Sequence, residues 1–173
     1  MCEIKLIKMR KKFIILGYGN PDRGDDGVAY YLLNELIRKY STRKEDLSDF
    51  QEAGILDLSP EIDLWYNLQL IPEVSQDLAN YEHAIFLDAH TTEIPEPILV
   101  KEILPGYKNS PFTHHLTPGS CLDLAEKLYR HAPLATLVTV RGYSFDFSRE
   151  LSTETKILAE QALQIIDDLI QKG

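Results

Sequence analysis

Cysteine, long apolar runs and signals for export are all scarce in this sequence. Cys2 and Cys121 are the only two cysteines among 173 residues, too few for a disulfide framework, and no CxxC pair indicates zinc. No apolar run approaches the roughly 20 residues that a membrane-spanning helix needs. The opening MCEIKLIKMRKKFIIL contains basic residues but has neither a clean apolar core nor a small-residue cleavage site. We therefore expect a cytoplasmic protein without a signal peptide and without membrane insertion.

Positive charge is also in short supply. The chain has 18 Lys and Arg against 27 Asp and Glu, which gives a formal net charge of −9. Because phosphate backbones repel a protein this acidic, the charge argues against a nucleic-acid partner. The basic residues gather only at 5–12 and 38–44. A protein or peptide partner is the better expectation, and the oligomeric state stays open.

The length and the hydrophobic fraction of 44% fit one domain over residues 1–173, with 1–12 as an N-terminal lead. Apolar runs predict five strands at 13–19, 67–74, 83–90, 98–104 and 135–142. Helical patterns alternate with them, after Asp25, at 75–81, at 117–131 and from Ser152. Residues 41–66 show only a possible short helix. This alternation predicts a three-layer α/β/α domain with a mixed, mostly parallel five-stranded sheet.

The fourth strand is expected to run against the others. Only seven residues, TTEIPEP, separate the third strand from the fourth, whereas a parallel return needs a dozen or more. Pro118 suits the first turn of its helix, and Ser152 suits an N-cap. The spacing of apolar residues predicts these core-facing helix positions: Val28, Leu32, Leu33, Leu36, Ile37, Cys121, Leu122, Ala125, Leu128, Tyr129, Ile157, Leu158, Ala162, Ile165, Ile166 and Leu169.

Chemistry is expected where acids follow the strands. Asp22, Asp25 and Asp26 lie in the turn after the first strand, and Asp88 ends the third. Sites in open α/β sheets form beyond the carboxyl ends of strands, so neighbouring first and third strands would bring these acids together. His114 and His115 precede the helix that begins near Pro118. Two carboxylates and an imidazole with open positions suit a first-row divalent metal.

Each of these residues also has a purely structural interpretation. Asp25 or Asp26 could N-cap the first helix, Asp88 could form a strand-end turn, and the histidine pair could be solvated or hydrogen-bonded. Other catalytic templates fail: GxGxxG is not met, because Asp22 stands at the third glycine, and G-x-S-x-G and H-E-x-x-H do not occur. Cys121 lies on the apolar face of a helix, a poor place for a nucleophile.

Three motifs in order, GYGNPDRGDDG, IFLDAH and THHLTP, resemble the [NiFe]-hydrogenase maturation proteases. The similarity runs from about Phe13 to the C-terminus. These endopeptidases trim the C-terminal extension of the hydrogenase large subunit after nickel insertion. The resemblance implies the same activity here, an aspartic-type, nickel-recognising endopeptidase, with the hydrogenase large-subunit precursor as partner. It also implies a phosphorylase/hydrolase-like fold with the five-stranded sheet and antiparallel fourth strand.

The resemblance implies that the family's metal-binding and catalytic residues correspond to Asp26, Asp88 and His114, with His115 as the fallback ligand. Asn20 and Asp25 are supporting candidates. Nickel is implied as the metal, supplied by the precursor, and the same ligands also suit other divalent cations. The cation would polarise the scissile carbonyl or acidify a water, with a carboxylate as proton acceptor. One departure is that PEVSQ replaces an acidic glycine-rich turn, so that any role of that turn passes to Glu73 or is absent.

Two alternative functions remain open from the sequence. A peptidyl-tRNA hydrolase also begins with a strand and a G-x-G-N-P turn, but it requires an Arg, His and Asn cluster and a basic surface, where this chain has RGDDG and a net charge of −9. A non-cleaving module that binds nickel or hydrogenase could share the fold. Only a cleavage assay separates that module from a protease.

Overall fold

The computed structural model describes residues 10–41, 54–106 and 116–173. In these ranges a six-stranded sheet has the order β2-β3-β1-β4-β6-β5. The strands are β1 (Lys11–Tyr18), β2 (Ile55–Asp57), β3 (Ile62–Asn67), β4 (Tyr81–His90), β5 (Ile98–Ile103) and β6 (Leu134–Arg141). The four central strands are parallel, and the edge strands β2 and β5 are antiparallel to their neighbours. The predicted α/β class and mixed sheet are confirmed, with one strand more than expected.

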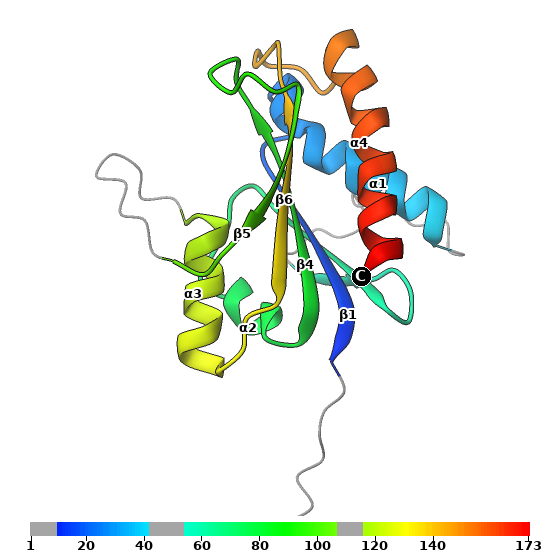
Figure 1. Ribbon diagram of the computed structural model, residues 1–173. Coiled ribbons are helices and arrows are strands. Elements are labelled where there is room, and N and C mark those ends of the chain that lie inside the picture. The colour runs from blue at the N-terminus through cyan, green and yellow to red at the C-terminus, as the bar shows by residue number, and fades with distance from the viewer. Residues whose placement is uncertain (1–9, 42–53, 107–115) are drawn as a thin grey trace, which may run out of the picture.

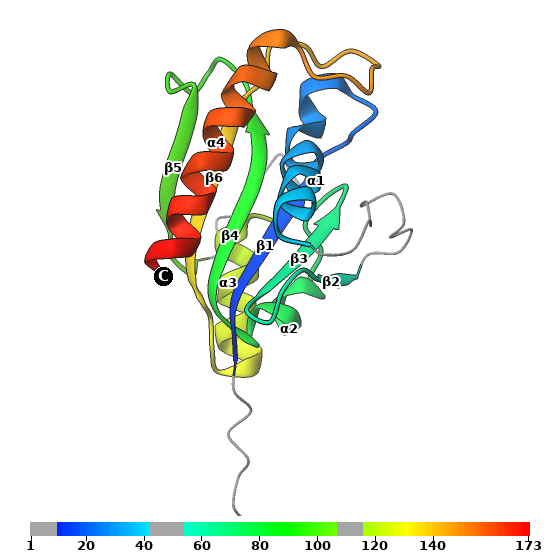
Figure 2. The same ribbon diagram turned by 90° about the vertical axis from the view of Figure 1, so that its right-hand side faces the viewer.

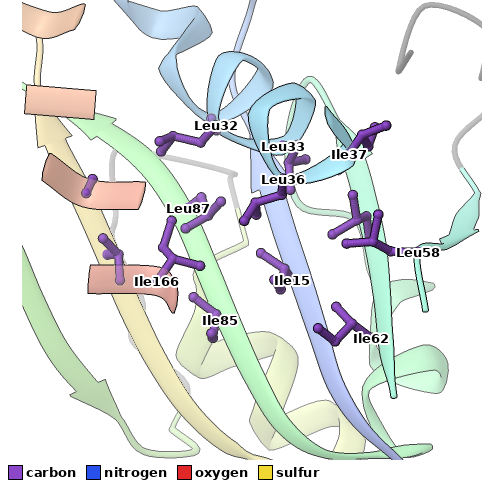
Figure 3. Packing of buried hydrophobic residues seen from close by; sticks show 14 of the residues in the cluster. Ile15, Leu32, Leu33, Leu36, Ile37, Leu58, Ile62, Ile85, Leu87 and Ile166 are labelled. Carbon is purple, nitrogen blue, oxygen red and sulfur yellow. The ribbon is translucent and has the colours of Figure 1, made fainter. Parts of the chain in front are cut away.

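Helices cover both faces of this sheet (Figures 1 and 2). On one face lie α1 (Val28–Tyr40) and α4 (Thr153–Lys172), and on the other lie α2 (Val74–Leu78) and α3 (Pro118–Tyr129). Figure 3 shows the core under α1, where Leu32, Leu33 and Leu36 face Ile15 of β1 and Leu87 of β4. Burial of these fully enclosed side chains supplies the main driving force for the layered arrangement.

Local signals explain where the helices begin. Thr117 accepts a hydrogen bond from the Ser120 N–H at 3.2 Å, with Pro118 in the first turn of α3. Ser152 accepts from the Thr155 N–H at 3.3 Å, which confirms it as the N-cap of α4. Both caps satisfy N–H groups that have no partner within the helix. No helix in the described ranges is both long and apolar enough to cross a membrane.

The segment around 55–74 differs from the prediction. Residues 67–74 were expected to form the second strand, but β3 ends at Asn67 and α2 begins at Val74. Pro72 lacks the N–H of an interior strand residue, and its carbonyl instead accepts the Ser75 N–H and hydroxyl at the start of α2. The true strands β2 and β3 lie inside a stretch, 41–66, that was expected to be irregular. Asp63 interrupts the apolar pattern of β3. This acid is nevertheless buried, and its carboxylate accepts a hydrogen bond from the Tyr81 hydroxyl.

Three predicted core positions are wrong. Leu128, Tyr129 and Ile157 are exposed, although most other positions on the same helical faces are buried or partly buried. Leu128 and Tyr129 lie in the last turn of α3, and Ile157 lies near the start of α4. Helix ends extend past the sheet they cover, so a periodic apolar residue there can lack a neighbour to pack against. Cys121 is fully buried as expected, and burial raises the pKa of its thiol to about 12.

Candidate functional site

The site lies at the carboxyl ends of β1 and β4, which are neighbouring parallel strands. The chain leaves β1 toward β3 on one side and later returns to β4 on the other, so the connections diverge between β1 and β4. Such a switch point leaves a crevice outside the strand ends, where α/β proteins place their ligands. The turn after β1 leads into a short 3-10 helix, η1 (Gly24–Gly27), which carries Asp25 and Asp26. The predicted adjacency of the two strands is confirmed.

Asp88 lies in β4 beside the last residue of β1. The register pairs Gly17 with Leu87, so that Tyr18 comes opposite Asp88 and the Tyr18 hydroxyl donates a hydrogen bond to its carboxylate. The Ala89 N–H donates a second hydrogen bond at 2.8 Å. Burial raises the pKa of Asp88 to about 7, and the charge of Asp26 adds to the rise, while both hydrogen bonds oppose it. Asp88 therefore exchanges a proton near neutral pH.

Asp26 is held on the turn itself. Its Oδ2 accepts the Asn20 N–H at 2.8 Å, and the Asn20 side chain accepts the Asp22 N–H at 2.9 Å. Asn20 therefore positions the carboxylate through its backbone and shapes the turn through its amide. The charge of Asp26 contributes to the raised pKa of Asp88, so the two acids lie close enough to interact. Neither Asp25 nor Asp26 caps η1 or α1 through its side chain, so the helix-cap interpretation is wrong.

Asp25 points away from Asp26 and performs a different task. It is fully buried, and its carboxylate accepts the N–H groups of Tyr143, Ser144 and Ser152 at 2.7–2.8 Å together with the Ser152 hydroxyl. Burial alone would raise the pKa of Asp25, but these hydrogen bonds hold it below its ordinary value. Asp25 is thus an ionised anchor that ties the loop 142–152 and the start of α4 to the site turn.

The structure assigns no role to the other residues that the sequence predicted for the site. His114 and His115 lie outside the described residues. Glu73 is exposed next to α2. Within the described ranges, no group of three His, Cys, Asp or Glu side chains could hold a metal ion. The carboxylates of Asp26 and Asp88 are nevertheless of a ligand type that suits a divalent cation, and the charge of Asp26 acts on Asp88.

Two tyrosines that the sequence analysis did not single out contact the candidate site. Tyr18 holds Asp88, and the Tyr66 hydroxyl donates to the Gly19 carbonyl at 2.7 Å, which clamps the site turn to β3. Burial, together with the charge of Asp88, raises the pKa of Tyr18 well above its ordinary value, so it stays a donor. The register between β1 and β4 was the signal that could have found Tyr18, because it brings the last residue of β1 opposite Asp88 on the same face of the sheet.

Gly19 is required by the geometry of the site turn. Its φ is +133°, and an added Cβ would lie 2.2 Å from the backbone oxygen of Asp26. We expect Gly19→Ala to cost about 2–4 kcal/mol of unfolding free energy, because neither backbone segment can yield without displacing Asp26. Urea unfolding measures the loss. Gly106→Ala, where an added Cβ meets nothing within 4 Å, is the matched control and should change stability by under about 0.5 kcal/mol. Equal stability of the two variants would show that the turn is not so constrained.

Proteins that are similar to this chain in sequence or fold are named as hydrogenase maturation proteases. No family model matches the chain. A Methanocaldococcus jannaschii protein, proposed by its name to be a hydrogenase maturation protease, is 23% identical over 99% of this chain and 97% of its own. The [NiFe] hydrogenase maturation protease HycI of Thermococcus kodakarensis has a TM-score of 0.63 at 19% identity, with 94% of each chain covered. The hydrogenase maturating endopeptidase HybD of Escherichia coli gives 0.58 at 20%, also over 94% of each.

The sheet order and the paired acids define an α/β protein with a candidate site at the switch point between β1 and β4. More narrowly, this fold is that of the [NiFe]-hydrogenase maturation proteases, and the resemblance predicted from the sequence is confirmed.

Proposed function

We propose that this chain is a hydrogenase maturation protease that removes the C-terminal extension of a nickel-loaded [NiFe]-hydrogenase large-subunit precursor in the cytoplasm. The observation that carries the proposal is the pairing of Asp26 and Asp88 at the switch point of this fold. Relatives and structural neighbours with the same fold are named for hydrogenase maturation.

In this proposal nickel is part of the substrate. Asp26, Asp88 and His114, with His115 as the fallback, would engage the nickel that the precursor carries, so that only a loaded precursor is held for cleavage. Bound there, the cation would polarise the scissile carbonyl. The Tyr18 hydroxyl and the Ala89 N–H keep the Asp88 carboxylate oriented toward the site. Asp88 also titrates near neutral pH, which suits a group that must bind the ion when ionised and exchange a proton when it is not.

The basic side chains near the site do not favour the alternative function of a peptidyl-tRNA hydrolase. The site turn holds Asp22, Asp25 and Asp26, and Arg149 is already paired with Asp22. An anionic edge of this kind favours a substrate that delivers positive charge.

The test is a processing assay with the purified chain and a large-subunit precursor from the same genome. The nickel-loaded precursor should lose its C-terminal extension, seen as a single mass decrease by intact mass spectrometry, while the nickel-free precursor should stay whole. Catalysis should raise the rate of processing at least about 10³-fold over the reaction without enzyme. If the chain binds the loaded precursor and leaves its mass unchanged, it is a binding module instead.

A further inference from the structure

The loop 142–152 presents two aromatic side chains to solvent next to the site. Phe147 is 92% exposed and Tyr143 is 48% exposed. Phe145, between them, turns inward, because its ring lies so close to Gly142 that an added Cβ there would come within 2.5 Å of it. Exposed aromatic side chains are enriched where proteins contact one another. Tyr143 and Phe147 together are called the aromatic ridge below.

The loop that carries the ridge is held rigidly. The Asp25 carboxylate accepts hydrogen bonds from its beginning, at Tyr143 and Ser144, and from its end, at Ser152. The Asp25 N–H in turn donates to the Ser144 carbonyl at 2.8 Å. A side chain on a loop that is already ordered loses little conformational entropy when a partner covers it, so the ridge is preorganised for contact.

The ridge is also tied to the turn that carries Asp26. Ser148, the neighbour of Phe147, donates its N–H to the Asp22 carbonyl at 3.0 Å and accepts the Gly24 N–H at 2.7 Å. The two segments form a parallel bridge between Arg23 and Ser148. Figure 2 shows the loop reaching from the start of α4 across to the turn ahead of α1. A molecule seated on Phe147 is therefore placed at a fixed position relative to Asp26.

A groove of about 670 Å³ continues from this loop between α1 and α4. Tyr30, Tyr31 and Arg38 of α1 line one side, and Arg149 and Leu151 of the loop line the other. Its arginines already have partners, since Arg38 pairs with Glu35 and Arg149 pairs with Asp22. Lys156 and Glu150 also line the groove, with opposite charges. The ridge itself is aromatic and uncharged, which favours an apolar contact.

We propose that the aromatic ridge docks an apolar patch on the folded body of the large-subunit precursor, while the tail of that precursor enters the site at Asp26 and Asp88. This inference rests on the proposed function and adds the contact that aligns the substrate. The precursor is the occupant because the loop that carries the ridge is hydrogen-bonded to the turn that carries Asp26, so that a molecule bound to the ridge is presented to Asp26. A second copy of the chain seated on the ridge would crowd the same edge.

The experiment compares Phe147→Ala with the wild-type chain on the nickel-loaded precursor. Phe147→Ala should raise KM about 10- to 100-fold and leave kcat within about two-fold, because the ridge contacts the body of the substrate and not the reacting bond. Its urea midpoint should equal that of wild type, since the side chain is almost entirely exposed. Leu128→Ala, an exposed apolar residue on α3, is the matched control and should change KM less than about two-fold.

A binding arm separates this proposal from the proposed function. In an Asp26→Asn background, calorimetry with the same precursor should show Kd raised by the same 10- to 100-fold when Phe147→Ala is added. If wild type neither binds nor cuts the precursor, the proposed function fails. If wild type binds and cuts and Phe147→Ala does likewise, the docking proposal alone is overturned. Sedimentation tests the other occupant, because a homodimer lost in Phe147→Ala would also overturn it.

Discussion

Asp88→Asn is expected to lower processing of the nickel-loaded precursor at least about 10³-fold, down to the rate without enzyme. The amide keeps the size of Asp88 and one oxygen that can still accept the hydrogen bond from the Ala89 N–H. It removes only the charge that would hold a cation and accept a proton. Rates are measured by intact mass spectrometry with both variants of the acid pair, Asp88→Asn and Asp26→Asn. Residual cleavage within about ten-fold of wild type would contradict a role for Asp88 in the chemistry.

The same substitution is expected to stabilise the protein in the absence of substrate. The pKa of Asp88 is about 7 in the folded chain against an ordinary value of 3.8, so the folded state prefers the protonated acid. The unfolding free energy of the wild-type chain is therefore highest below pH about 4 as far as Asp88 is concerned. It falls as the pH rises between the two pKa values and is lowest above pH about 7. The shift sets an upper limit of about 4 kcal/mol at pH 8, and relaxation around the charge reduces this to about 1–2 kcal/mol.

Urea unfolding at pH 8 and at pH 4 tests the sign of this effect. Asp88→Asn should be more stable than wild type at pH 8 by about 1–2 kcal/mol, and the gap should close at pH 4, where the wild-type acid is protonated. A gap of the opposite sign at pH 8 would mean that the carboxylate is satisfied without a cation. The combination of lost activity and gained stability is the signature of a residue kept for function at a structural cost.

Asp25→Ala is expected to be the most destabilising single change at the site, by about 3–5 kcal/mol. Asp25 is fully buried, and its removal leaves the N–H groups of Tyr143, Ser144 and Ser152 without their acceptor. Each abandoned donor costs about 1–3 kcal/mol, and the loop can recover part of this by opening to water. The loop 142–152 should then become a site of limited proteolysis.

The pH dependence of that loss follows from the low pKa of Asp25. Hydrogen bonds hold the pKa below its ordinary value, so the stabilisation is full above pH about 4 and is lost as pH falls through the folded value. Urea unfolding should therefore show the whole difference between wild type and Asp25→Ala at pH 7 and a smaller one at pH 3. Asp146→Ala, an exposed acid on the same loop, should change stability by under about 0.5 kcal/mol. Similar losses of unfolding free energy in the two variants would contradict the role of Asp25 as an anchor.

The acid pair shows how far sequence reasoning reached in the site. Asp26 and Asp88 could be placed together because the strands before them were apolar runs, and carboxyl ends of adjacent parallel strands meet at one edge. The division of labour within the Asp25–Asp26 pair could not be predicted. Adjacent residues on a tight turn point in different directions, and the partners of Asp25 lie more than a hundred residues away along the chain.

The strand pattern shows a second limit. β1 and β4 were recognisable because both faces of a central parallel strand are buried, so that such a strand appears in the sequence as a continuous apolar run. β3 was missed because Asp63 interrupts it, and that acid is tolerated only through its hydrogen bond from Tyr81 and its ion pair with Lys11. The direction of β5 followed from a short connection, but its partner is β6, a strand that comes later in the chain.

The sequence by itself determined the layered α/β class, the central strands, the long helices and the turn of acids, because periodicity, capping and chain length are local properties. Only the tertiary structure decided that Asp25 anchors a distant loop, that burial raises the pKa of Asp88 to about 7, and that Phe147 is exposed on the loop beside the site turn. Burial, charge proximity and hydrogen bonding between remote segments depend on the folded arrangement, and no spacing along the chain encodes them.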